Sequence, residues 1–192
     1  MRDRILGPTV ETVGIVLAVF VVQVIALTIG LSIDLFALSM PLEDNPWTIV
    51  TAVYAHAGIS HLVANLVALI VFGYIVERRS SRWRFHAFIV TTGALAGIAE
   101  VIVGSLMGAS PLVVGISGAV FALMGYILAS NPVTDSAVAW LEVDVRVQLV
   151  LMLLIAVAIT WITRGERVAL VAHFTGFLLG LISGRAHLLR AR

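Results

Sequence analysis

The sequence predicts an all-α, polytopic membrane protein, and three observations carry that prediction. Hydrophobic residues make up 60% of the 192 residues and charged residues only 12%, with a mean hydropathy of +1.08; a soluble domain carries about 25% charged residues. The apolar residues gather in six long runs, and the charges lie between those runs. This composition excludes an ordinary soluble domain, a disordered chain and a nucleic-acid binder.

Each apolar run is predicted to form one membrane-spanning helix, because a helix that crosses ~30 Å of hydrocarbon needs about 20 residues. The first run follows Arg2 and Arg4, as a signal peptide would, but it is too long and lacks a cleavage site, so we expect a retained helix. Residues 1–192 are expected to form a single membrane domain. The six runs are Val10–Ile33, Ile59–Val76, His86–Met107, Ser117–Ser130, Val147–Thr163 and Val168–Leu188.

The arginines predict the orientation of the chain, since cytoplasmic loops are enriched in basic residues. All twelve basic residues are arginine. If both termini are cytoplasmic, only Arg164 and Arg167 fall outside. We therefore expect a multi-pass protein of the cell membrane with both termini in the cytoplasm. The ten arginines on the inner side would be Arg2, Arg4, Arg78, Arg79, Arg82, Arg84, Arg146, Arg185, Arg190 and Arg192.

The first outside connection, residues 34–58, is unusually apolar for a loop. A segment of this composition is expected to lie half embedded in the membrane interface, with Trp47 and Tyr54 at the level of the lipid headgroups.

The residue types that are missing also narrow the chemistry. The chain has no cysteine, which excludes disulfides, iron–sulfur clusters and zinc–thiolate sites. It has no lysine, which excludes Schiff-base chemistry. No metal and no cofactor are expected.

Several polar residues are predicted to lie at one depth in the membrane. The fourth run spans only ~21 Å as a helix, so Ser117 at its outer end lies ~10 Å below the outer surface. His173 and Glu100 reach a similar depth on the sixth and third runs, and His61 and Asn65 lie one helical turn apart on the second run. Polar residues inside a membrane are costly and tend to mark function.

This layer favours acyl transfer. The hydroxyl of Ser117 needs a base to take its proton, and His173 is the candidate base. Ser117 begins a helix, where free backbone N–H groups can hold an oxyanion, and Asn65 with a histidine can add side-chain donors. Gly115 lets the backbone turn tightly beside a substrate.

At these residues the sequence resembles the rhomboid family of intramembrane serine proteases. Four motifs in order carry the resemblance, which covers about residues 45–184. They are His56-Ala-Gly-Ile-Ser-His61-Leu-Val-Ala-Asn65, Gly115-Ile-Ser117-Gly118, Ala172-His173-Phe-Thr-Gly176-Phe-Leu-Leu-Gly180 and the pair Glu77-Arg78.

The resemblance implies a minimal six-helix prokaryotic form with a catalytic dyad of Ser117 as nucleophile and His173 as base. His61 and Asn65 would assist at the oxyanion. Where the family often has tyrosine four residues after the serine, this chain has Phe121, which keeps ring stacking on the histidine but loses a hydroxyl.

Other residues take supporting roles in the same interpretation. Gly176 and Gly180 would let the sixth helix pack closely on the fourth. His56 would shape the wet cavity or be structural. Glu100 is a candidate cavity residue with three open roles: a protonated acid, a group that holds cavity water, or a partner of a histidine.

The resemblance predicts an endopeptidase that cuts single-span membrane proteins near the outer face, with lipids and such substrates as its partners. One alternative is a rhomboid-like protein that binds transmembrane segments without cutting them. The other is a six-helix transporter, which would have inverted repeats and a polar track across the membrane. The inner halves of the second, fourth and sixth runs are instead nearly all apolar.

Overall fold

The computed structural model describes residues 7–130, 144–162 and 169–190. Among these residues the regular structure is helical, apart from one isolated antiparallel bridge. The prediction of an all-α protein is therefore confirmed for the described part of the chain. In chain order the elements are α1 (Pro8–Thr28), the 3-10 helix η1 (Ile33–Leu35), α2 (Thr48–Thr51), α3 (Ile59–Glu77), α4 (Arg82–Leu106), α5 (Ser117–Ala129), α7 (Val145–Ile162) and α8 (Leu170–Arg185).

Each predicted apolar run overlaps one helix over most of its length, although α4 begins at Arg82, four residues before the predicted start at His86. Helices α1, α3 and α4 are long and apolar enough to cross a membrane, whereas the apolar stretches of α5, α7 and α8 are shorter. The count of six spans and the single domain over residues 1–192 therefore stay predictions. Five arginines used to predict the orientation lie outside the described residues: Arg2, Arg4, Arg164, Arg167 and Arg192.

Helix α1 ends at Thr28 rather than at Ile33, where the apolar run ends. Gly30 has a φ of +87°, a left-handed conformation that glycine adopts without strain. The backbone N–H of Leu31 then donates to the carbonyl of Ala26 at 3.0 Å, which closes the helix end. The predicted span was too long because apolar composition continues past this glycine stop.

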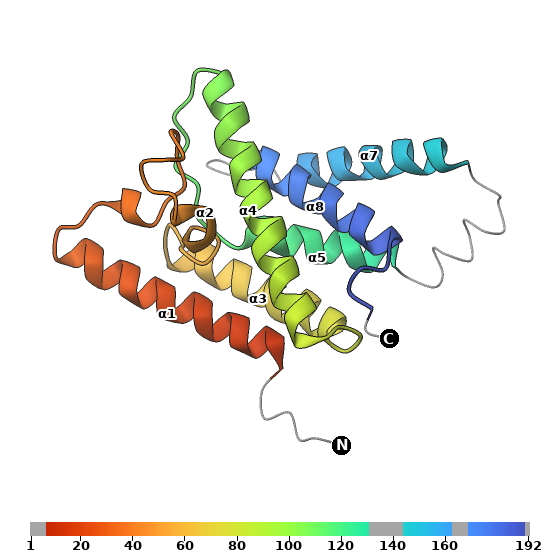
Figure 1. Cartoon of the computed structure of the whole chain (residues 1–192), viewed down its shortest axis with the longest axis horizontal. Helices are drawn as coiled ribbons and strands as arrows, with labels where there is room; N and C mark the ends of the chain where they lie inside the picture. Colours follow the sequence, from red (N-terminus) through yellow and green to blue (C-terminus); the bar gives the residue numbers. More distant parts are fainter. Residues whose placement is uncertain (1–6, 131–143, 163–168, 191–192) are drawn as a thin grey trace.

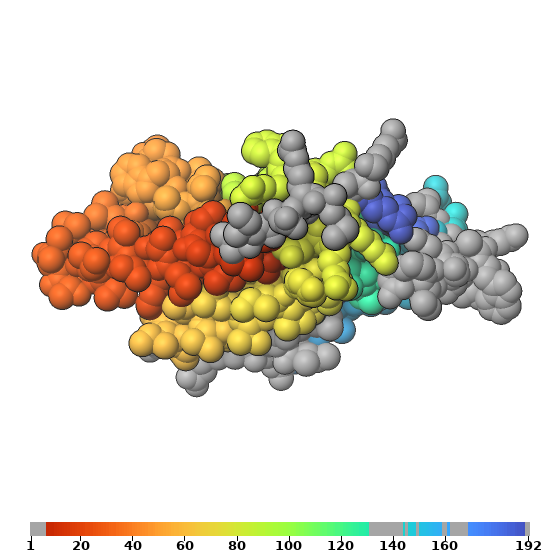
Figure 2. Space-filling view, turned by 90° about the horizontal axis from the view of Figure 1, so that it is seen from below, coloured from red at the N-terminus to blue at the C-terminus, as the bar shows by residue number. Residues whose placement is uncertain are grey.

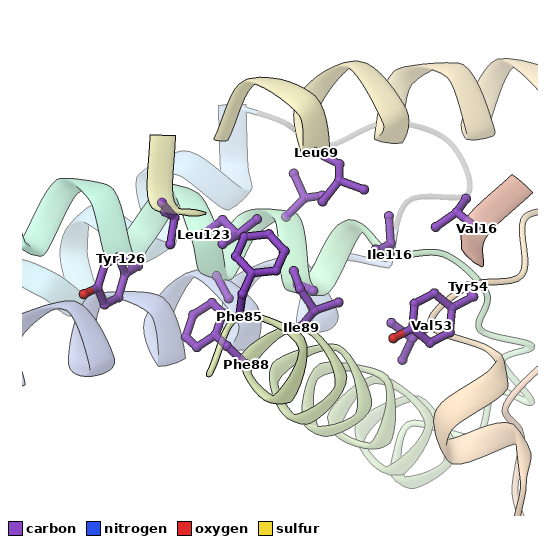
Figure 3. Packing of buried hydrophobic residues seen from close by; sticks show 14 of the residues in the cluster. Val16, Val53, Tyr54, Leu69, Phe85, Phe88, Ile89, Ile116, Leu123 and Tyr126 are labelled. Carbon is purple, nitrogen blue, oxygen red and sulfur yellow. The ribbon is translucent and has the colours of Figure 1, made fainter. Parts of the chain in front are cut away.

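Helix α5 lies at the centre of the bundle, with α3, α4 and α8 around it (Figure 1). The side chains of Leu69 from α3, Phe85 and Ile89 from α4, and Leu123 from α5 meet in one buried cluster (Figure 3). Lipid tails are as apolar as these side chains, so close van der Waals packing rather than removal from water holds such helices together.

Glycines bring α8 unusually close to α5. A Cβ atom added at Gly176 would overlap the carbonyl oxygen of Gly118, and one added at Gly180 would overlap that of Ala122. Gly125 of α5 leaves the same kind of space for the carbonyl of Phe177 on α8. The two helices therefore touch backbone to backbone, which small residues allow in membrane proteins.

The chain between α4 and α5 is not helical, yet its backbone groups find partners in the first loop. Leu38 and Val113 exchange two backbone hydrogen bonds of 2.9 Å. The N–H of Gly115 donates to the carbonyl of Ala52 at 2.9 Å. Irregular backbone at membrane depth needs such partners, and these bonds hold the chain in place as it approaches Ser117.

The two aromatic residues of the first loop differ from one another. Trp47 is 49% exposed and its indole N–H donates to the carbonyl of Leu35 at 3.0 Å. Tyr54 is only 8% exposed and lies in the protein core, near Val53 and Ile116 (Figure 3). Neighbouring segments therefore cover the ring of Tyr54, which packs against protein rather than lipid. The membrane depth of this loop stays a prediction.

Helices α1 and α3 lie side by side along one face of the molecule (Figure 2). Their outward side chains are large and apolar: Val22 and Ile25 of α1 are each 57% exposed, and Val67 of α3 is 58% exposed. An apolar surface of this extent suits contact with lipid rather than water.

Opposite the start of α5, ion pairs and hydrogen bonds join α1, α3 and α4. Glu11 of α1 pairs with Arg82 and, at 2.9 Å, with His86, both of α4. Glu77, the last residue of α3, accepts a hydrogen bond of 2.9 Å from the backbone N–H of Thr9. These polar contacts fix the ends of three helices against one another.

Candidate active site

Ser117 is the first residue of α5 and is half-buried. The first turn of an α-helix leaves its N–H groups without partners inside the helix. The N–H groups of Ser117 and Gly118 therefore point out of the helix end, where the helix dipole favours negative charge. The sequence prediction that a helix begins at Ser117 is confirmed.

His173 lies in the first turns of α8, and its ring stacks on that of Phe121 with centroids 4.1 Å apart and an interplanar angle of 19°. Phe121 is four residues after Ser117, so both lie on one face of α5. The stack therefore holds His173 against the face of α5 that carries Ser117.

Among the described residues, Ser117 and His173 make no hydrogen bond with each other, and Nδ1 of His173 is buried without a partner. Catalytic hydrogen bonds are often long in a free enzyme and tighten when substrate binds. The structure brings α5 and α8 together and orients the ring of His173 through its stack on Phe121.

His61 and Asn65 face the backbone just before Ser117. A Cβ atom added at Gly115 would lie 2.7 Å from Cε1 of His61 and 3.5 Å from Nδ2 of Asn65. Gly115 also has a φ of +122°, which residues with a side chain rarely adopt. Glycine is therefore required here twice, once for the turn and once for the close approach of these two side chains.

The amide of Asn65 is a buried donor without an acceptor. The side chain is only 6% exposed, and Nδ2 has no hydrogen-bond partner among the described residues. Leaving such a group unpaired costs about 1–3 kcal/mol. A donor kept at that cost beside the start of α5 is available for a negatively charged oxygen.

His56 is almost completely buried and is held by a residue that the sequence analysis did not consider. Gln23 of α1 donates to the carbonyl of His56 at 2.9 Å and accepts from its backbone N–H at 3.0 Å. The imidazole of His56 packs edge-on to that of His61, with centroids 5.2 Å apart. Burial lowers the pKa of His56 to about 4, so the ring is neutral at pH 7.

A lone amide in an otherwise apolar run was the signal that could have pointed to Gln23, because such residues usually hydrogen-bond inside the protein. The chain distance of 33 residues between Gln23 and His56 hid the partner. Nε2 of His56 remains buried without a partner in the described part of the chain.

Glu100 of α4 reaches the first turn of α8. Its Oε2 accepts a hydrogen bond of 2.9 Å from the backbone N–H of Ala172, the residue before His173. The residue before the helix, Ala169, makes no side-chain capping bond. Glu100 therefore supplies from another helix the acceptor that a capping side chain would normally provide.

A small cavity of about 20 Å³ lies beside Ser117. Its walls include Gly115, Gly118, Ala96 and Ala172. A space of this size accommodates about one water molecule or one small group.

A family model of the Rhomboid domain matches residues 43–190, most of the chain. This chain belongs to the rhomboid family. As a rhomboid it is a multi-pass membrane protein, and the matched segment contains every candidate site residue from His56 to Gly180 while leaving α1 outside.

Curated relatives agree with this membership. RHOMBOID-like protein 5 of Arabidopsis thaliana is 28% identical over 148 residues, covering 77% of this chain and 46% of that protein. Rhomboid protease GlpG of Haemophilus influenzae is 24% identical over 144 residues, covering 74% and 70%. Rhomboid-like protease 3 of Toxoplasma gondii is 30% identical over 138 residues, covering 70% and 49%. The chain thus spans about half the length of the plant and Toxoplasma relatives.

Proposed function

We propose that this rhomboid is an intramembrane serine endopeptidase with Ser117 as nucleophile and His173 as general base. The observation that carries the proposal is the stack of His173 on Phe121, one turn after Ser117 on the same helix. A base held at this place can take the proton of the hydroxyl, which is a poor nucleophile until that proton leaves.

In the first step, Oγ of Ser117 attacks the carbonyl carbon of the scissile peptide bond while His173 accepts the hydroxyl proton. The carbonyl oxygen becomes an oxyanion. The backbone N–H of Ser117, the unpartnered amide of Asn65 and the ring of His61 are the donors that stabilise it. His173 then gives its proton to the leaving amine, and an acyl-enzyme ester on Ser117 remains.

In the second step, water attacks the ester while His173 again accepts a proton. The acid product leaves and the hydroxyl of Ser117 is restored. Every proton transfer in both steps uses His173, and the other reactants are the substrate and one water molecule. His56, neutral, packs edge-on against His61, and it lines a separate hollow with Gln23 rather than the small cavity beside Ser117.

The substrates are proposed to be single-span membrane proteins, cut near the outer face of the cell membrane. A transmembrane helix hides its carbonyls in hydrogen bonds, so it must unwind before Ser117 can attack. Glycine and proline lower the cost of unwinding by about 1 and about 3 kcal/mol relative to alanine. The small cavity beside Ser117 favours a small residue, such as alanine, before the cut.

Cleavage of a model single-span substrate in liposomes tests this function. Wild type should cut the substrate, whereas Ser117→Ala and His173→Ala should each abolish cleavage while the purified proteins stay folded. Rates should rise when glycine or proline lies just after the cut, and fall when those positions become leucine or the residue before the cut becomes bulky. Binding of the substrate without cleavage by wild type would favour the non-proteolytic alternative.

Two measurements separate the serine chemistry from the unwinding model: the cut site, mapped by mass spectrometry, and the dependence of the cleavage rate on the helix stability of the substrate. Loss of cleavage in both variants together with rates that ignore helix stability would overturn only the unwinding model. Unchanged turnover in His173→Ala would overturn the dyad.

A further inference from the structure

A second hollow lies at the opposite end of α5 from Ser117. It is a groove of about 320 Å³ between the last turns of α3 and α5 and the chain that follows α8. We infer that this groove, here called the arginine pocket, binds the phosphate headgroup of an anionic phospholipid. Its polar wall consists of Arg78, Arg79, Arg190, Tyr74, Tyr126 and Ser130.

Three arginines from distant parts of the chain line the arginine pocket. Arg78 and Arg79 follow α3, whereas Arg190 follows α8, and all three are exposed. Arginines that served only to orient the chain in the membrane would have no reason to surround a common hollow. Guanidinium groups match phosphate oxygens in geometry and charge.

Among the described residues, those that line the arginine pocket include no acid. Two acids at the described ends of α1 and α3 are engaged elsewhere: Glu11 pairs with Arg82 and His86, and Glu77 accepts from the N–H of Thr9. Arg78 donates to the hydroxyl of Tyr74 at 3.3 Å, and its guanidinium carbon lies 4.8 Å from the centroid of that ring. Within the described part of the chain, the positive charge of the pocket therefore has no acidic partner in its wall.

The remaining wall is apolar and faces outward. Ile75 of α3 is 48% exposed, and Ile127 of α5 also lines the groove. A free phosphate ion gains nothing from such a wall, whereas the acyl chains of a lipid would lie along it. Basic pockets between membrane helices are a known mode of binding for anionic headgroups. The combination favours a lipid over a soluble anion.

Thermal unfolding of the full chain in neutral detergent tests the inference with three probes. Phosphatidylglycerol should raise the Tm of wild type by about 2–4 °C, because a ligand that binds only the folded state stabilises it. Phosphatidylcholine, whose headgroup has no net charge, and inorganic phosphate should each raise it by far less. A shift with inorganic phosphate as large as that with phosphatidylglycerol would overturn the lipid assignment.

Three variants locate the effect. Arg79→Gln and Arg190→Gln should lose most of the phosphatidylglycerol shift, whereas Arg146→Gln, which removes an exposed arginine outside the pocket, should keep it. Native mass spectrometry should show one retained phosphatidylglycerol on wild type and on Arg146→Gln. Equal shifts in all three variants would mean general attraction between charges and would contradict a pocket. Neither readout depends on proteolysis, so failure of the proposed function would leave this test unaffected.

Discussion

The two ends of α5 treat buried polar groups in opposite ways. Around Ser117, three buried nitrogens lack hydrogen-bond partners among the described residues: Nδ2 of Asn65, Nε2 of His56 and Nδ1 of His173. At the other end, acids and cations are paired across α1, α3 and α4. One group of that network, the hydroxyl of Thr9, is buried without a partner among the described residues.

This contrast between unpartnered and paired polar groups supports the proposal that catalysis takes place at the Ser117 end. Most buried polar groups in proteins are hydrogen-bonded, so a cluster of unpartnered ones needs a reason. Around Ser117 the proposed function supplies that reason: a substrate whose carbonyl oxygen and protons would complete the bonds. At the other end, here called the paired end, the polar groups of Glu11, Arg82, His86 and Glu77 hold α1, α3 and α4 together. Substitutions at the first end should therefore change turnover, and those at the second should change stability.

Outside the Ser117–His173 dyad, the largest effect is expected from Asn65→Ala. Removing one oxyanion donor should lower kcat by ~10–1000-fold, with a smaller change in KM. The exposed Ser60, also on α3, provides the control: Ser60→Ala should leave kcat near wild type. Initial cleavage rates over a range of substrate concentrations check both. Unchanged kcat in Asn65→Ala would reassign the amide to packing and weaken the contrast between the two ends.

The seam between α5 and α8 should be the next most sensitive. Gly176→Ala places a methyl group against the carbonyl of Gly118, so it should lower the free energy of unfolding by about 1–3 kcal/mol. Gly14→Ala on α1 meets open space and should be neutral or slightly stabilising. Denaturant titration in mixed micelles measures both. Equal stability of the two variants would show that the helices can separate at no cost.

Glu100 should give a smaller, graded effect. Glu100→Gln keeps an acceptor for the N–H of Ala172 and should lose little activity, whereas Glu100→Leu removes it and should cost up to about tenfold in kcat/KM. The measurement is kcat/KM for both variants beside wild type. Equal and severe loss in both would mean that the negative charge of Glu100, rather than its acceptor atom, supports His173.

The smallest effect is expected at the paired end. Glu11→Gln weakens the contacts with Arg82 and His86 and should lower the free energy of unfolding by less than about 1 kcal/mol, because the arginine is largely exposed. Turnover should stay within about twofold of wild type. A fall in kcat comparable with that of Asn65→Ala would abolish the distinction between the two ends.

Much of this architecture could be predicted from the sequence, because each membrane helix corresponds to one continuous apolar stretch of the chain. Long apolar runs place the helices, and the short fourth run places Ser117 at a helix start. The end of α1 is also determined by a nearby residue, Gly30. Apolar composition alone does not predict this end, because the residues after Gly30 are apolar too.

The contacts between remote segments could not be predicted. The hydrogen bonds of Gln23 with His56 and of Glu100 with Ala172 each join residues far apart in the chain. The burial of Tyr54 likewise depends on neighbours from other elements. Spacing within one helix shows which residues share a face, but it does not show which other helix covers that face.

Ser117 is proposed to be a nucleophile that is activated at the start of α5. Its most direct test is labelling with a serine-reactive fluorophosphonate in detergent, with the modified peptide identified by mass spectrometry. Wild type should carry one adduct, on Ser117, and Ser117→Ala should carry none. His173→Ala should label far more slowly, because no base takes the proton. Equal labelling of wild type and Ser117→Ala would contradict the account.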